Sequence, residues 1–158
     1  MTMSYAGRAR HRAKLGCAMF AASLATIASV GTMAQENLPN ACPVDGCEVT
    51  IAGVGKAGDE LAVTFESNFM PEMSKNHIHV WWGESYTIEQ VSDNAEPTYG
   101  VKQGDWHPTD EFPAYTTQSA ASVSVRNGAH TLCVTAADRN HDILDPKVYH
   151  CVDVGDHL

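Results

Sequence analysis

Two histidines separated by a single residue are the part of this chain whose residue types and spacing could do chemistry. His77 and His79 lie in the sequence Asn-His-Ile-His-Val-Trp-Trp-Gly, whose β-branched and aromatic residues favour a β-strand. Alternate side chains of a strand point to the same face and lie about 7 Å apart, so the two imidazoles share one surface. Imidazoles are largely neutral near pH 7 and can then ligate a metal ion. The pair predicts a metal site on this strand.

The alternation that brings the histidines together also separates a core face of the strand from an outer face. We expect three side chains to pack into a hydrophobic core: Ile78, Val80 and Trp82. We expect the other three to lie on an exposed outer surface: His77, His79 and Trp81. An exposed strand face would present the imidazoles to a metal ion without rearrangement.

Two ligands bind a metal ion weakly, so the site needs further donors. Met70 and Met73, just before the strand, offer soft thioethers, and His141 in a later loop offers a third imidazole. Thioether sulfur suits Cu(I), while imidazole suits Cu(II) or Zn(II). This donor set favours copper, with zinc as a weaker candidate.

The loop that carries His141 also offers oxygen ligands. Asp138, Asn140 and Asp142 alternate as at the start of an EF-hand calcium loop. The pattern then departs from that loop, because Ile143 stands where glycine is required and Tyr149 where the bidentate glutamate should be. Calcium is therefore a weaker candidate than copper, and a solvated acidic turn is the simpler interpretation.

Aromatic residues support a different kind of function. Trp81, Trp106 and Tyr115 could form an exposed stacking platform, which would make the protein a noncatalytic module that binds a carbohydrate, another small ligand or a protein. The chain has no Gly-x-Ser-x-Gly turn, no phosphate-binding glycine loop and no His-Glu-x-x-His helix. A binding protein is therefore expected more than an enzyme.

The first 34 residues have the features of a secretory signal peptide. Basic residues at 8, 10, 12 and 14 precede an apolar run over 15–30, and small residues lead to a cleavage site after Ala34. Polar residues interrupt the run, which is shorter than the roughly 20 residues that span a bilayer. We expect removal of residues 1–34, a single domain over 35–158, no membrane span after cleavage, and a periplasmic or secreted location.

The expected mature chain is acidic. Residues 35–158 contain six basic and 19 acidic side chains, which gives a net charge of −13. Such a surface repels nucleic acid and anionic lipid and attracts cations. We expect a metal ion or a small ligand as the partner, no binding of nucleic acid, and a monomer.

Four cysteines remain after the expected cleavage: Cys42, Cys47, Cys133 and Cys151. An even number of cysteines in an exported chain indicates disulfides, and three pairings are possible. Cys133 and Cys151 alternate with apolar residues in two strand-like segments, so they could project from the same side of neighbouring strands. We therefore expect the disulfides Cys133–Cys151 and Cys42–Cys47. A zinc site made of all four thiolates is disfavoured, because the spacing lacks two close pairs.

Short segments with strand-like alternation and turn signals between them dominate the rest of the chain. Residues 48–66 predict a β-hairpin, and residues 149–154 predict a last strand. Residues 86–91 fit either a short helix or a strand. Residues 92–118 contain four clusters of turn-forming residues and predict a long surface loop, which is more often functional or mobile than filler.

Asn127-Gly128 gives a further local signal. The pair separates two alternating runs, 122–126 and 130–136, and predicts a two-residue hairpin turn, because both turn positions need positive φ. No part of residues 35–158 shows convincing helical periodicity. The sequence therefore predicts an all-β fold, an antiparallel immunoglobulin-like or cupredoxin-like β-sandwich with a long inserted loop.

A resemblance to known proteins rests on three segments. The His-x-His strand, the run 132–138 with the following Asn140-His141, and the closing run 151–154 resemble small exported bacterial β-sandwich domains of unassigned function. The resemblance covers residues 48–154 and implies the compartment and the architecture. The His-x-His strand is also similar to the copper strand of copper-zinc superoxide dismutases, whose later ligand loop has no counterpart here. Blue-copper proteins are disfavoured, because Cys133 lacks the closely spaced downstream His and Met of their site.

Overall fold

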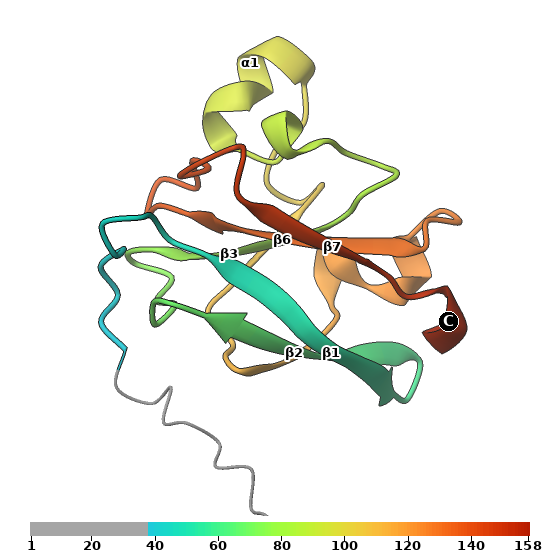
Figure 1. The fold of residues 1–158 in the computed structure, drawn as a ribbon. Coiled ribbons are helices and arrows are strands. Elements are labelled where there is room, and N and C mark those ends of the chain that lie inside the picture. Colours follow the sequence, from blue (N-terminus) through green and yellow to red (C-terminus); the bar gives the residue numbers. More distant parts are fainter. Residues whose placement is uncertain (1–37) are drawn as a thin grey trace, which may run out of the picture. The chain divides into compact units, whose positions relative to one another are not determined.

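The computed structural model describes residues 38–158, which form two antiparallel β-sheets with little helix. The predicted signal peptide, residues 1–34, lies outside the described residues. One sheet has three strands in the order β1 (Val49–Ala57), β2 (Glu60–Ser67), β5 (Ala114–Thr116). The other has four in the order β4 (His107–Thr109), β3 (His77–Trp82), β6 (Thr131–Ala137), β7 (Tyr149–Asp153). The predicted all-β sandwich is confirmed (Figure 1).

The helical segments of the described residues are all short. One is an α-helix of a single turn, α1 (Glu96–Tyr99). The others are 3₁₀ turns: η2 (Ile88–Gln90), η3 (Asp93–Ala95), η4 (Ser119–Ala121), η5 (Val123–Val125) and η6 (Gly155–His157). Among residues 38–158, no helix combines the length and the apolar character needed to cross a membrane.

The main hydrophobic core lies between the two sheets, as the alternation predicts. From β2 it receives Leu61, Val63 and Phe65, and from β3 it receives Ile78, Val80 and Trp82. All six side chains are buried. Each buried side chain of this size contributes about 1.5–3 kcal/mol to stability. The apolar residues at alternate positions of β3 therefore determine which face of the strand points inward.

The outer face of β3 is covered as well, and the prediction that it is exposed is wrong. His77, His79 and Trp81 are at most 1% exposed. The segment between β3 and β4 packs over this face and adds a second apolar cluster, composed of Trp81, Ile88, Val91, Val101, Trp106 and Cys133. The α1 segment lies on the side of the four-stranded sheet away from β1 and β2 (Figure 1). Apolar side chains within the predicted loop require this burial.

Residues 92–118 contain strands that the sequence did not predict. β4 pairs with β3, and β5 pairs with β2, so each short strand extends one of the two sheets. Both have only three residues, and β4 contains Pro108, which is tolerated at a sheet edge but weakens any strand pattern. The undecided segment 86–91 contains the 3₁₀ turn η2.

The hairpin predicted around Asn127-Gly128 is not formed. Both turn residues have the expected positive φ, 52° and 89°, but the run before them folds into η5 instead of a strand. Glu60 on β2 explains this outcome. Its carboxylate accepts hydrogen bonds from the Ser122 hydroxyl and from the Val123 amide, which hold the run against the three-stranded sheet.

Both expected disulfides are present. Cys42–Cys47 closes a short loop before β1, and Cys133–Cys151 joins β6 to β7 at positions that lie directly opposite each other in the sheet. The first hairpin is also confirmed, since β1 and β2 pair from Val49↔Ser67 to Ala57↔Glu60.

Candidate metal centre

Three imidazoles converge on the outer face of the four-stranded sheet. The Nε2 atom of His77 lies 3.1 Å from Nε2 of His79 and 2.8 Å from Nδ1 of His141. One ligand nitrogen from each of the three rings lies within 4.8 Å of the others. Nitrogens bound about 2.0–2.1 Å from one metal ion are separated by about 2.9–3.5 Å at bond angles of 90–120°. The cluster therefore has the size of a metal site and could hold one ion.

The sheet register explains why His141 reaches the strand pair. β3 runs antiparallel to β6, with His79 opposite Thr135 and His77 opposite Ala137, the last residue of β6. The chain leaves the sheet directly beside His77, and His141 follows four residues later. The loop after β6 is thus the element that can supply a third ligand to the outer face of β3.

Backbone carbonyls set the hydrogen positions on the two strand histidines. His77 Nδ1 lies 3.1 Å from the carbonyl oxygen of Lys75, and His79 Nδ1 lies 2.8 Å from that of Val91. A carbonyl oxygen only accepts, so each Nδ1 carries the hydrogen and donates it. A neutral imidazole has a single N–H, which leaves Nε2 of both rings as a bare lone pair. Such an orienting hydrogen bond on the other ring nitrogen is typical of metal-ligating histidines.

The two bare Nε2 atoms cannot bond to each other, because neither has a hydrogen to donate. An N–H on His141 Nδ1, 2.8 Å away, can donate to His77 Nε2 but leaves the His77–His79 pair without a shared hydrogen. A proton or a metal ion between the two Nε2 atoms would satisfy both lone pairs. Burial lowers the pKa of His77 and lowers that of His79 well below its ordinary value, against the smaller raising effect of the hydrogen bonds to Lys75 and Val91. Protonation is therefore disfavoured in this place, and the neutral form that binds metal is favoured.

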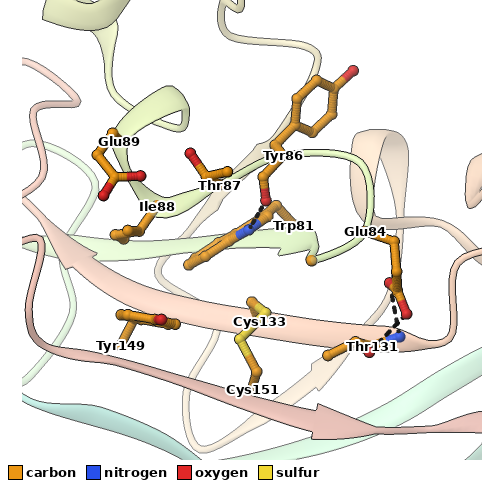
Figure 2. A pocket seen from close by; sticks show the side chains of 11 residues that line it. Trp81, Glu84, Tyr86, Thr87, Ile88, Glu89, Thr131, Cys133, Tyr149 and Cys151 are labelled. Carbon is orange, nitrogen blue, oxygen red and sulfur yellow. Dashed lines mark hydrogen bonds between the residues drawn. A yellow bond between two sulfur atoms is a disulfide. The ribbon is translucent and has the colours of Figure 1, made fainter.

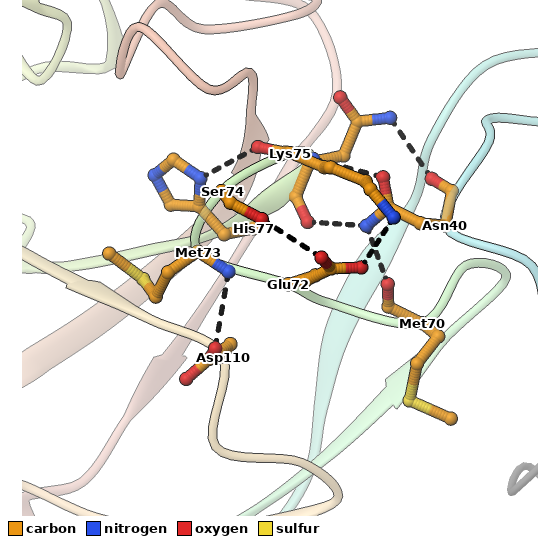
Figure 3. A network of polar contacts seen from close by, with 9 residues as sticks. Asn40, Met70, Glu72, Met73, Ser74, Lys75, His77 and Asp110 are labelled. Atoms are coloured by element: carbon orange, nitrogen blue, oxygen red, sulfur yellow. Dashed lines mark hydrogen bonds and ion pairs between the residues drawn. The ribbon is translucent and has the colours of Figure 1, made fainter.

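The turn before β3 holds the Lys75 carbonyl in place. The Asn40 side-chain amide donates to the carbonyls of Met70 and Asn76, at 2.7 and 2.8 Å. The Lys75 ammonium pairs with Glu72 on the surface of the same turn, as Figure 3 shows. The turn therefore links the N-terminal segment to the hydrogen bond that orients His77.

The two predicted methionine ligands differ in their placement. Figure 3 shows the Met73 side chain extending to the side of the turn where the His77 ring lies, whereas the Met70 side chain extends away from that ring. The Met73 amide donates to Asp110 at 3.1 Å, which ties this residue to the segment after β4. Both methionines are partly buried. Met73 is thus placed better than Met70 for a contact near the three imidazoles.

An indole covers one side of the cluster. The Trp106 ring stacks on His79 with ring centroids 3.8 Å apart and an interplanar angle of 25°. Trp106 is fully buried, and its centroid lies 5.7 Å from that of His141. His141 is the one ligand candidate of the three that is only partly buried. The site is therefore closed by Trp106 and reached by solvent beside His141.

The carboxylates of the loop after β6 are occupied by backbone groups. Asp138 Oδ1 accepts from the amides of Asn140 and Asp142, at 2.8 and 3.1 Å, and Asp142 Oδ1 accepts from the amide of Asn94 at 2.9 Å. These contacts are those of a hydrogen-bonded turn. The oxygens are used to shape the loop around His141, in accord with the interpretation of this segment as an acidic turn.

The exposed aromatic platform predicted from Trp81, Trp106 and Tyr115 is not present. All three rings are at most 2% exposed. Tyr115 lies in the core between the sheets and stacks on Phe65, whereas the two tryptophans belong to the outer cluster. Trp81 instead forms a wall of a cavity of about 360 Å³ that also borders the Cys133–Cys151 disulfide (Figure 2).

Sequence reasoning named the three imidazoles but missed what surrounds them. The sequence predicts Trp106 only as part of an exposed ligand platform, and it predicts no role at the site for Val91. Ile88, Val91 and Val101 follow no clear period in the sequence, although apolar residues in and just before a predicted surface loop are a sign of burial. Carbonyl partners such as that of Val91 carry no side-chain signal in a sequence.

Comparisons with protein-family models, with curated protein sequences and with solved structures gave no match for this chain.

Proposed function

We propose that this protein is an exported protein that binds a transition metal, copper in preference to others, through His77, His79 and His141. The observation that carries the proposal is the pair of bare Nε2 atoms 3.1 Å apart, each on a ring whose Nδ1 donates to a backbone carbonyl. Neither atom has a hydrogen to donate to the other, and His141 Nδ1 lies within hydrogen-bond distance of His77 Nε2, at 2.8 Å. A metal ion would bind both and the nearby His141 nitrogen.

The chemistry of the donors favours copper over zinc and calcium. Three imidazole nitrogens suit copper and zinc, and nitrogen or sulfur sites bind Cu(II) most tightly among the divalent ions of the first transition row. Calcium prefers six to eight oxygen ligands, which this cluster does not offer. A contribution from the Met73 thioether would extend the preference to Cu(I).

The disulfides and the predicted signal peptide support an exported location. Two disulfides are typical of proteins that fold in an oxidising compartment, the periplasm or the exterior of the cell. The charge of −13 expected for residues 35–158 would favour the approach of cations to such a protein. We propose a monomer, because the three ligands come from one chain.

Metal titration of the purified, metal-free protein tests the proposal. Isothermal titration with Cu(II) and Zn(II), and competition with a chromogenic chelator for Cu(I), should each give one ion per chain, with copper bound more tightly. The His77→Ala/His79→Ala double variant should weaken binding by more than about 100-fold, because loss of an outer-shell partner alone costs about 10- to 100-fold.

The matched control is His157→Ala, which removes an imidazole near the C-terminus and outside the cluster. This variant should bind metal as the wild type does. Equally weak binding by the wild type and by the double variant would overturn the proposal. Binding that is lost in the control as well would show that the ion sits elsewhere.

A further inference from the structure

One short segment, residues 91–94, contacts two of the three imidazole-bearing residues. The Val91 carbonyl accepts from His79 Nδ1 at 2.8 Å. Two residues later, the Asp93 amide donates to the carbonyl of His141 at 3.0 Å. Residues 91–94 therefore join β3 to the loop after β6 directly beside the cluster. We call this segment the strap.

Asp142 fastens the loop to the strap. Its Oδ1 atom accepts from the Asn94 amide at 2.9 Å. It also lies 3.4 Å from the Ser92 hydroxyl, whose single hydrogen has a nearer acceptor in Asn94 Oδ1 at 3.1 Å. The Ser92 oxygen in turn accepts from the Ile143 amide at 3.1 Å. Ser92 is buried, so its bonds are partly shielded from competing water, whereas the bond between Asn94 and Asp142 is exposed. The strap and the loop after β6 are about 50 residues apart in sequence. Asp142 is the residue of this loop whose side chain takes part in the bonds described here.

The bonds between Asp142 and the strap act next to a residue whose backbone conformation needs support. His141 has a φ of +63°, in the left-handed region that non-glycine residues seldom adopt. Such a conformation costs of order 1 kcal/mol or more and persists only where the surroundings enforce it. Bonds within the loop, from the amides of His141 and Asp142 to Asp138, supply part of that enforcement. The bonds of Asp142 and of the His141 carbonyl to the strap supply the rest. Without them the loop could relax, and Nδ1 would leave its position 2.8 Å from His77.

We infer that Asp142 is a positioning residue for the metal centre: through Ser92 and Asn94 it holds His141 in its ligating position and so sets how long a bound metal ion stays. The inference rests on the proposed metal-binding function. His141 is the partly exposed member of the cluster, while His77 and His79 are fully buried. Exchange of the ion therefore begins at His141, and the bonds between Asp142 and the strap control that step.

A double-mutant cycle between Asp142 and His141 tests the inference. Asp142→Ala removes the acceptor, and it should weaken Cu(II) affinity by about 10- to 100-fold, as outer-shell changes do, mainly through faster release to a chelator. Asp142→Asn keeps an oxygen at the same place and should largely restore the affinity. In a His141→Ala background, Asp142→Ala should cause no further loss, because the residue acts through that imidazole.

Asp145→Ala is the matched control in the same loop. Asp145 is exposed and accepts from the Lys147 amide, away from the strap, so its replacement should leave Cu(II) affinity unchanged. Pulsed electron paramagnetic resonance, which counts coordinated imidazoles, should find three in the wild type and in Asp145→Ala. It should find two in Asp142→Ala, a change that a general loss of stability would not produce.

The outcomes separate this inference from the proposed function. Wild-type affinity in Asp142→Ala, or an equal loss in the presence and absence of His141, overturns the inference alone. A wild-type protein that binds no metal overturns both. If Asp142→Ala does not fold, the same cycle with Ser92→Ala decides, because that change removes the acceptor of the Ile143 amide, which joins the loop to the strap.

Discussion

At the scale of single residues, the candidate centre depends on burial as much as on ligand type. His79 is fully buried, stacks on Trp106 and donates to the Val91 carbonyl. An imidazole in this environment stays neutral, which is the form that ligates a metal ion. A solvent-facing pair of histidines, as the sequence alone predicts, would be free to protonate near its ordinary pKa.

The metal-free protein should lose stability on acidification because of this burial. The folded-state pKa of His77 and His79 is lowered, so below about pH 6.5, the pKa of an unfolded-state histidine, the unfolded chain binds more protons than the folded chain. The free energy of unfolding then falls with decreasing pH, by up to about 1.4 kcal/mol per pH unit for each histidine.

Urea denaturation in the presence of a chelator, at pH 7.5, 6.5 and 5.5, measures this effect. The His79→Gln variant, which has no titrating ring at position 79, should show a flatter dependence of stability on pH than the wild type. Parallel curves for the two proteins would contradict the assignment of a lowered pKa to His79.

The placement of Met73 leads to a second prediction for a single side chain. If its thioether contributes to the centre, Met73→Leu should weaken Cu(I) binding more than Cu(II) binding, because a thioether prefers the softer ion and leucine keeps the apolar volume. Met70→Leu is the control, since that side chain extends away from His77 (Figure 3). Equal Cu(I) affinities in the two variants would exclude Met73 as a ligand.

At the scale of elements, the predictions from sequence succeed where a period exists and fail where tertiary contacts decide. The face of β3 that packs into the main core and the pairing of the β1–β2 hairpin both follow from alternating apolar residues. The run 122–126 alternates equally well, yet it forms η5, because Glu60 supplies acceptors that a strand at this position would not use. A carboxylate more than 60 positions away leaves no local mark in the sequence.

The same limit applies to the candidate site. The His-x-His spacing and the third histidine are visible in the sequence, because they are chemical groups with few other uses. The cover over them is not visible, since it is composed of apolar residues scattered through residues 88–106. The strap is hidden for the same reason: its bonds to the centre use the backbone of Val91 and Asp93.

Glu60 should therefore matter for stability and not for metal binding. Its pKa is lowered, because hydrogen bonds from Ser122, Thr117 and the Val123 amide outweigh the raising effect of burial. Glu60→Ala should lower the free energy of unfolding by about 2 kcal/mol, the order expected for hydrogen bonds to a charged group. The stabilisation is present above about pH 4.5 and is lost as the pH falls through the folded-state pKa.

Glu66→Ala on the same strand is the control, because Glu66 is exposed and should contribute little. Chemical denaturation at pH 7 compares the two variants. Similar stabilities would contradict the role given to Glu60, and a loss of metal affinity in Glu60→Ala would contradict its separation from the centre.

At the scale of the whole molecule, residues 38–158 form a sandwich with an additional cover on one face. The main core between the sheets uses the inner side chains of β3 and β6, and the outer side chains of the same two strands form the floor of the candidate centre. The two central strands are therefore buried on both faces. This arrangement gives the ligands a rigid support, which favours a preorganised metal site.

The two disulfides should contribute unequally to global stability. Cys133 and Cys151 are 18 positions apart, and Cys42 and Cys47 are five positions apart. On the chain-entropy estimate the longer loop contributes about 3 kcal/mol and the shorter about 2 kcal/mol. Denaturation of the two paired Cys→Ala variants measures the difference. A larger loss in the Cys42→Ala/Cys47→Ala variant would contradict this order.

Anomalous diffraction from a crystal of the copper-loaded protein tests the central claim most directly. Data collected on either side of the copper absorption edge should give one peak within about 2.0–2.1 Å of His77 Nε2, His79 Nε2 and His141 Nδ1, the usual distance between an imidazole nitrogen and a metal ion of this size. A copper peak away from these three nitrogens, or no peak in a protein shown to be loaded, would contradict the claim.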